Sequence, residues 1–168
     1  MQRKSDIMKY LKDNDEKEAI KYLNMCAKLA KKATCLRRKG GSIIVKDKEI
    51  IGEGFNSPVS NLESQRRCNI DKDTYNKKIT DKTCCIHAEQ RAIINALKTN
   101  ANKIEGSRLY FNAVDENGNI VKAGKPYCTI CSKFALDTGI KEFVLWHEEG
   151  VCVYNTEEYN NLSYQYKE

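Results

Sequence analysis

The sequence contains no long apolar run: 31% of its 168 residues are charged and 40% are hydrophobic. A membrane-spanning helix needs about 20 mainly apolar residues, so this composition excludes one. The same balance of charged and apolar residues disfavours wholesale disorder. Residues 1–6 also lack the apolar stretch of a secretion signal, and we therefore expect a soluble, cytoplasmic protein.

Phenylalanine and tryptophan are few as well. The chain has four Phe and one Trp, so it lacks the aromatic-rich platform on which proteins stack single-stranded nucleic acid. Its net charge of +6 is a mild excess. Such an excess fits a phosphorylated ligand but falls short of the strongly basic balance of nucleic-acid-binding modules.

Cysteine, in contrast, is abundant. In a reducing cytosol several cysteines together indicate metal binding or catalysis sooner than a disulfide framework. The eight cysteines are Cys26, Cys35, Cys68, Cys84, Cys85, Cys128, Cys131 and Cys152.

The periodicity of apolar residues predicts one α/β domain over residues 1–168, a length that buries about 70% of the unfolded surface. Helices are predicted over 15–33, 87–98 and 128–137, with a last helix capped by Thr156, and strands over 42–46, 49–55, 108–112, 142–146 and 151–154. This order predicts one sheet with helices on both faces and some parallel strands. A polar, cysteine-bearing stretch at about 57–85 has no clear periodicity and is interpreted as an insertion, which inside a compact domain is usually functional or tied by a metal.

Two short segments carry most of the chemical information. His87-Ala88-Glu89 begins one predicted helix, and a run from Pro126 to Cys131 begins another. Cys128 and Cys131 lie three residues apart on one helical face, near the positive end of the helix dipole, which favours thiolates. Two thiolates and one imidazole give zinc three protein ligands and leave the fourth position open, as in catalytic sites.

Glu89 lies two residues from His87 and points elsewhere than the metal. It is close enough to take a proton from water activated at the metal and to pass it on. Cys-x-x-Cys alone also fits a redox pair or half of a structural zinc site, and His-x-Glu alone is common by chance. His147, the other histidine, is interpreted as an exposed polar residue.

Together the two segments form H-x-E followed by P-C-x-x-C, the signature of zinc-dependent nucleobase deaminases. From about residue 15 to residue 146 the chain resembles this family, and residues 35–58 and 138–144 resemble its deoxycytidylate deaminase branch. Two features depart from the pattern: Tyr127 separates Pro126 from Cys128, and 128 − 87 = 41 residues separate the first two ligands. The turn at 115–119 accommodates the extra length. The resemblance implies a three-layer α/β/α sandwich with a mixed sheet of about five strands.

The resemblance also implies substrate contacts. Asn56 is expected to reach the sugar or the pyrimidine, although a turn asparagine before proline is the alternative; Ala88 is expected to contact substrate as well. A basic cluster beside the predicted hairpin contains Arg37 and Arg38, which suit a 5′-phosphate because the arginine fork matches phosphate geometry. A merely solvated basic face is the competing interpretation.

A second metal site is implied by the same resemblance, since some deoxycytidylate deaminases carry another zinc that ties the insertion to the body. Four thiolates would form a closed structural site and would keep a long polar stretch ordered. Unpaired thiols are the alternative, because Cys26 and Cys152 are already outside any such set. The candidate ligands are Cys35, Cys68, Cys84 and Cys85.

These patterns predict a zinc-dependent enzyme that deaminates a cytosine nucleotide, most simply dCMP to dUMP and ammonia. The resemblance further implies a homo-oligomer. One alternative keeps the chemistry but acts on a base in RNA or single-stranded DNA. Another is a non-catalytic, zinc-stabilised binding module, against which the presence of Glu89 argues.

Overall fold

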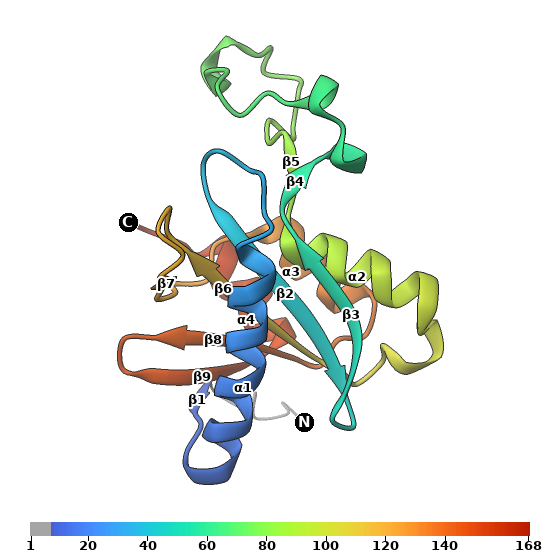
Figure 1. Ribbon diagram of the computed structural model, residues 1–168, viewed down its shortest axis with the longest axis vertical. Coiled ribbons are helices and arrows are strands. Elements are labelled where there is room, and N and C mark those ends of the chain that lie inside the picture. Colours follow the sequence, from blue (N-terminus) through green and yellow to red (C-terminus); the bar gives the residue numbers. More distant parts are fainter. Residues whose placement is uncertain (1–7) are drawn as a thin grey trace.

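The computed structural model describes residues 8–168, so the segment 1–6 discussed above lies outside the described residues. A mixed sheet runs through the centre (Figure 1). In spatial order its strands are β1 (Lys9–Tyr10), β9 (Gly150–Asn155), β8 (Glu142–His147), β6 (Arg108–Val114), β2 (Lys39–Lys46) and β3 (Glu49–Phe55), and β7 (Ile120–Val121) pairs with β6 off this path. β6 and β8 are parallel and the other pairs are antiparallel.

Four α-helices cover the sheet, one on one face and three on the other: α1 (Asp13–Ala30), α2 (Ala88–Thr99), α3 (Thr129–Asp137) and α4 (Thr156–Tyr164). The alternation of side chains along each strand produces this division. On β2, Ile43 packs with α1 while its neighbour Ile44 packs with α2, and on β8 Val144 faces α1 while Phe143 faces α4. The three-layer α/β/α architecture with a mixed sheet expected from the sequence is confirmed. Across residues 8–168, no helix has the length and apolarity needed to cross a lipid bilayer.

Some local predictions are corrected by the structure. α1 begins at Asp13 after Lys12, which makes no side-chain cap, so the helix begins two residues before the predicted start at residue 15. The side chain of Asn155 accepts the capping hydrogen bond of α4, and Thr156 is the first helical residue. The two-residue strands β1 and β7 were not expected, because two residues carry no readable periodicity.

Close packing of β3 against α2 positions the start of that helix. A Cβ atom added to Gly54 would lie 2.3 Å from the backbone oxygen of Ala88 and 2.5 Å from the backbone nitrogen of Ala92. Gly52 is in the same situation, 2.5 Å from the oxygen of Ala92. Glycine is therefore required on this face of β3, because a side chain would push the helix away.

The polar stretch predicted as an insertion leaves the body through a narrow neck and extends away from the sheet (Figure 1). The neck is a two-stranded pairing of β4 (Ser57–Pro58) with β5 (Cys85–Ile86). Between them lie three short 3₁₀ turns, Val59–Asn61, Glu63–Gln65 and Lys72–Thr74; a fourth, Ala101–Lys103, follows α2. The larger apolar residues of the segment are exposed, so it has little core of its own; they are Val59, Leu62, Ile70 and Ile79.

Candidate active site

Three potential metal ligands meet where the N-termini of α2 and α3 approach each other. His87 is the residue that precedes α2, and Cys128 occupies the same position before α3. The His87 Nδ1 atom lies 3.2 Å from the Cys128 sulfur and 3.2 Å from the Cys131 sulfur. The structure therefore brings together the three residues that the sequence motif singled out.

The donor set and its spacing fit zinc. In a tetrahedral site with Zn–S of 2.3 Å and Zn–N of about 2.05 Å, a nitrogen and a sulfur ligand are separated by roughly 3.6 Å. The observed separations of 3.2 Å are close to this value, so a small outward movement of the side chains accommodates the ion. Two thiols and one imidazole leave one coordination position for a ligand from solution.

The electrostatics of the cluster favour a thiolate at Cys128. Hydrogen bonds from Cys131 and from His87 lower the pKa of the Cys128 thiol to about 4. The hydrogen bond to Cys128 correspondingly raises the pKa of His87. An ionised sulfur is the form that binds a metal, so this arrangement prepares the site for a cation.

Glu89 is the second residue of α2, in its first turn, and is 7% exposed. Burial raises the pKa of its carboxyl group, and the charge of Cys128 acts in the same direction. Its side chain lines the same pocket as His87 and Cys128. A buried carboxyl group with a raised pKa, beside a metal cluster and open to a pocket, is suited to accept and return a proton.

The pocket above this cluster has an apolar wall and a basic rim. Phe111 of β6, Leu145 of β8 and Tyr159 of α4 contribute apolar surface. The basic side chains come from three separate segments, namely the loop before β2, the insertion and the loop before α3. No sequence pattern indicated that Phe111 and Leu145 would line this pocket, because both fit the alternation of ordinary core residues along β6 and β8.

Asn56, Ala88 and Arg38 all line the pocket. The Asn56 side chain accepts from the Gly40 backbone N–H at 2.8 Å and donates to the Arg38 carbonyl oxygen at 2.6 Å, which fastens the end of β3 to the start of β2. One N–H of its amide remains for a ligand. Ala88 is 2% exposed at the first turn of α2.

The two arginines of the basic cluster differ in their partners. Arg38 donates to the Tyr127 hydroxyl at 2.7 Å, and its guanidinium lies 5.5 Å from the centre of the Phe111 ring. Arg37 instead donates through Nε to the Cys68 carbonyl oxygen at 2.7 Å and through Nη2 to that of Ile70 at 2.8 Å. Arg38 therefore faces the pocket, while much of Arg37 is used in holding the insertion.

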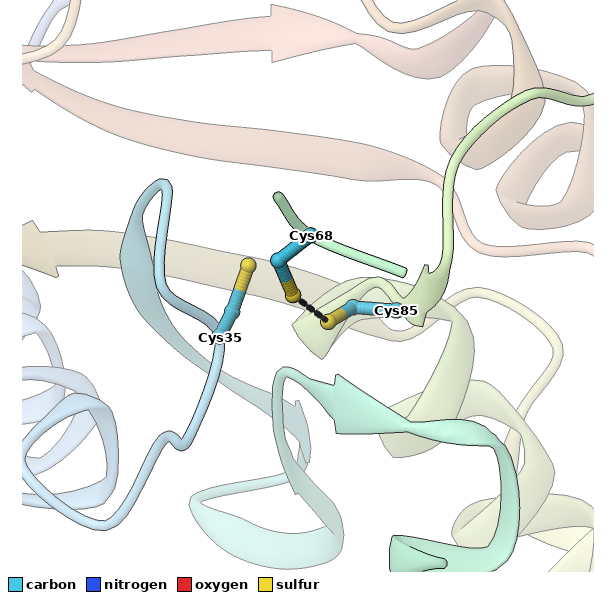
Figure 2. Close-up of side chains that lie close together, drawn as sticks. All are labelled: Cys35, Cys68 and Cys85. Atoms are coloured by element: carbon cyan, nitrogen blue, oxygen red, sulfur yellow. Dashed lines mark hydrogen bonds between the residues drawn. The ribbon is translucent and has the colours of Figure 1, made fainter. Parts of the chain in front are cut away.

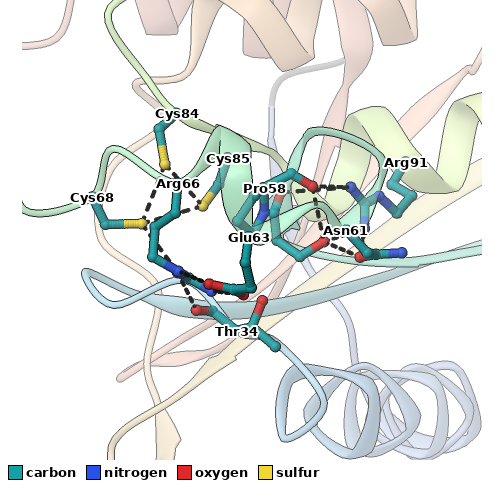
Figure 3. Close-up of polar contacts among 10 residues, drawn as sticks. Thr34, Pro58, Asn61, Glu63, Arg66, Cys68, Cys84, Cys85 and Arg91 are labelled. Carbon is teal, nitrogen blue, oxygen red and sulfur yellow. Dashed lines mark hydrogen bonds and ion pairs between the residues drawn. The ribbon is translucent and has the colours of Figure 1, made fainter.

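A second group of cysteines joins the insertion to the body. The sulfur atoms of Cys35, Cys68 and Cys85 lie within 4.8 Å of one another, and Figure 2 shows Cys68 and Cys85 pointing toward each other with Cys35 beside them. Cys84 completes the predicted set, with its sulfur 3.2 Å from that of Cys68 and 3.6 Å from that of Cys85 (Figure 3). Tetrahedral zinc separates two sulfur ligands by roughly 3.8 Å, so the spacing of Cys35, Cys68 and Cys85 fits three thiolate ligands. The Cys84 sulfur lies near two of them but outside the group within 4.8 Å, and it must move toward Cys35 to act as a fourth ligand.

The thiols of this group are electrostatically unequal. Although burial opposes ionisation, hydrogen bonds from the Leu36 backbone and from Cys84 and Cys85 lower the pKa of Cys68 to about 6. Burial, together with the neighbouring sulfur atoms of Cys35 and Cys68, raises the pKa of Cys85. The Cys68 sulfur thus ionises readily, while Cys85 holds a proton that a bound cation would displace.

His147 lies apart from both cysteine groups. Its Nε2 atom is 2.8 Å from the Tyr154 hydroxyl and its Nδ1 atom is 2.9 Å from the Ala123 carbonyl oxygen. The sequence predicted that His147 is exposed, but it is half-buried. Its contact with Ala123 holds the loop that leads to Pro126.

Comparisons with known proteins agree with this geometry. Residues 16–147 match the family model described as the cytidine and deoxycytidylate deaminase zinc-binding region. Comparison with curated protein sequences finds no significant match.

Solved structures with the same fold include the dCMP deaminase of cyanophage S-TIM5 in complex with dCMP and dUMP. It is 25% identical, with 79% of this chain and 82% of that chain covered and a TM-score of 0.54. The apo form of that enzyme is 23% identical over 76% of this chain and 80% of that one, also at 0.54. The cytidine deaminase of Burkholderia pseudomallei is 17% identical over 83% and 94% of the two chains, again at 0.54, and supports the fold alone.

Proposed function

The chain belongs to the zinc-dependent cytidine and deoxycytidylate deaminase family, and from this premise we propose that it hydrolyses the 4-amino group of a 5′-phosphorylated cytosine nucleotide, dCMP in the first place. The observation that carries the proposal is the meeting of His87, Cys128 and Cys131 beside the buried Glu89 in one pocket. The proposal for dCMP is further supported by the dCMP and dUMP bound to the phage enzyme described above.

In the proposed reaction His87, Cys128 and Cys131 hold the zinc ion. When bound, zinc supplies the Lewis acidity that makes water nucleophilic at neutral pH. Glu89 takes a proton from the attacking water and returns protons to N3 of the base and to the leaving amine. The water oxygen forms a bond to C4, the C4–N bond breaks, and ammonia leaves as uracil is formed.

Other pocket residues orient the base and limit water. Phe111 and Leu145 offer apolar surface against which a planar pyrimidine fits. Asn56 and Ala88 line the same pocket, where the remaining N–H of Asn56 and the backbone at Ala88 would contact the sugar or the base edge. Arg38 lies at the rim, where it would meet an anionic group of the substrate.

We propose that the second cysteine group holds a structural zinc ion through Cys35, Cys68, Cys84 and Cys85. The insertion has little apolar core, so a metal that links it to the loop before β2 explains how it keeps a defined position. Metal analysis of reduced protein should give two zinc ions per chain, falling to one in Cys84→Ser. Cys26→Ala is the matched control, because Cys26 lies outside both groups and is buried between α1 and the sheet. One zinc ion per chain in the wild type would contradict the second site.

The substrate is tested by measuring ammonia release from dCMP, CMP, deoxycytidine, cytidine and a cytosine-containing oligonucleotide. We expect the highest kcat/KM with dCMP. A preference for the oligonucleotide would favour the alternative of a polynucleotide deaminase, and absence of turnover with every cytosine substrate would contradict the proposed reaction. Assembly into a homo-oligomer stays a prediction.

A further inference from the structure

The rim of the pocket carries far more positive than negative charge. Six basic side chains line it, whereas Glu89 is the one acidic side chain among the lining residues. Three of the six belong to the insertion: Arg67, Lys72 and Lys82. Half of the positive charge around the pocket is therefore supplied by a segment outside the layered core.

These three side chains are not neutralised by the protein. In the part of the chain from residue 8 onward, the ion pairs within 4 Å are those of Arg66, Lys103 and Arg108. Arg67 is held instead by a hydrogen bond from its Nη1 to the Gln65 carbonyl oxygen at 2.7 Å, which leaves its other donors for a ligand. Unpaired cations around a pocket attract an anionic substrate and raise its local concentration.

The position of these cations depends on the contacts that hold the insertion. Arg66 donates to the Thr34 carbonyl oxygen at 2.7 Å and to the Cys68 sulfur at 3.4 Å, so it joins the insertion to the loop before β2 (Figure 3). Arg67 directly precedes Cys68, and Lys82 lies two residues before Cys84. Arg67 and Lys82 are thus close in sequence to cysteines of the group that joins the segment to the body.

We propose that the insertion is the phosphate-recognising element of this enzyme, with Arg67, Lys72 and Lys82 contacting the 5′-phosphate, and that the Cys35, Cys68, Cys84 and Cys85 group determines nucleotide selectivity by holding these cations over the pocket. The inference rests on the proposed deamination reaction and adds the source of its preference for a phosphorylated substrate. Phosphate carries about two negative charges at neutral pH, which two or three adjacent cations satisfy.

The test measures the selectivity ratio, defined as kcat/KM for dCMP divided by kcat/KM for deoxycytidine. In Arg67→Ala and Lys82→Ala we expect the ratio to fall at least tenfold, mainly through a higher KM for dCMP, because the lost contact is to a group that deoxycytidine does not possess. Lys77→Ala is the matched control. The substitution removes one positive charge from the same segment, but Lys77 does not line the pocket. Its ratio should equal that of the wild type. An unchanged ratio in both pocket variants, or an equal fall in the control, would overturn the assignment.

The role of the cysteine group is tested with Cys68→Ser and, separately, with Arg66→Ala, which removes an anchor without changing a sulfur atom. Both should lower the selectivity ratio at least tenfold while each chain keeps the zinc ion of the His87 site. If Cys68→Ser fails to fold, Arg66→Ala alone tests whether the anchoring of the insertion determines selectivity. A wild-type selectivity ratio in Arg66→Ala would refute that role. Failure of the proposed reaction is distinguishable, because the wild type would then release no ammonia from either substrate.

Discussion

Replacement of Gly54 by alanine should disturb stability and activity together. The new methyl group would lie 2.3 Å from the Ala88 oxygen and 2.5 Å from the Ala92 nitrogen, and both are backbone atoms of α2. Ordinary contacts need at least 3.4 Å, so the helix must move by roughly 1 Å away from β3. Because His87 and Glu89 lie at the start of this helix, the shift moves both relative to Cys128 and Cys131.

The expected cost of overpacking is about 1–3 kcal/mol. The methyl group also lowers the conformational entropy of the unfolded chain, which stabilises the folded state by up to about 1 kcal/mol. A clash with backbone atoms is at the upper end of that cost, so the net loss of about 2–3 kcal/mol should lower Tm by roughly 4–12 °C in a chain of this length. A misplacement of about 1 Å in the catalytic groups should lower kcat roughly a hundredfold.

Thermal unfolding followed by circular dichroism measures the first effect, and ammonia release from dCMP measures the second. Gly124→Ala is the control for stability, because a Cβ atom there meets no atom within 4 Å, and its Tm should equal or slightly exceed that of the wild type. If Gly54→Ala melts and turns over like the wild type, the packing of β3 against α2 does not position the site, and this reasoning is wrong.

Three further outcomes are expected. Leu23→Ala removes a fully buried side chain of α1 and should lower the free energy of unfolding by about 2–5 kcal/mol, measured by urea denaturation; a loss below about 1 kcal/mol would contradict the assigned core. Arg38→Ala should lower the dCMP-to-deoxycytidine selectivity ratio, and an equal loss with both substrates would instead indicate that Arg38 is structural. A strong chelator should abolish deamination before circular dichroism detects unfolding, and activity that survives complete removal of zinc would contradict the metal-dependent reaction.

Much of the fold could be predicted from the sequence because the patterns that specify it are local. The apolar spacing of α1 and the alternation on β2, β6, β8 and β9 gave the elements and their division between two faces. The turn between β2 and β3 was predicted at Asp47 and Lys48, which have φ values of 48° and 66°. Element ends were less accurate, since α1 begins at Asp13 without a side-chain cap and α4 is capped by Asn155 in place of Thr156.

The sequence predicted the site residues that belong to short motifs. It did not predict the pocket residues that come from distant segments of the chain. His87, Cys128 and Cys131 could be grouped because His-x-Glu and Cys-x-x-Cys are short motifs of metal-ligand residue types, each at the start of a predicted helix. The approach of Arg67 and Lys82 to the same pocket depends on the path of an aperiodic insertion, which no local pattern specifies. For the same reason the sequence did not reveal that Arg37 donates to two carbonyl groups of that insertion.

The most direct test of the central claim is ammonia release from dCMP by Glu89→Gln, compared with the wild type at equal zinc content. The amide keeps the size of the buried side chain but carries no proton between water, N3 and the leaving amine, so turnover should fall by about 10² to 10⁴-fold. Zinc content and substrate binding should be retained, because Glu89 is not among the three clustered ligands. A Glu89→Gln protein that deaminates dCMP at the wild-type rate would contradict the proposed role of this carboxyl group.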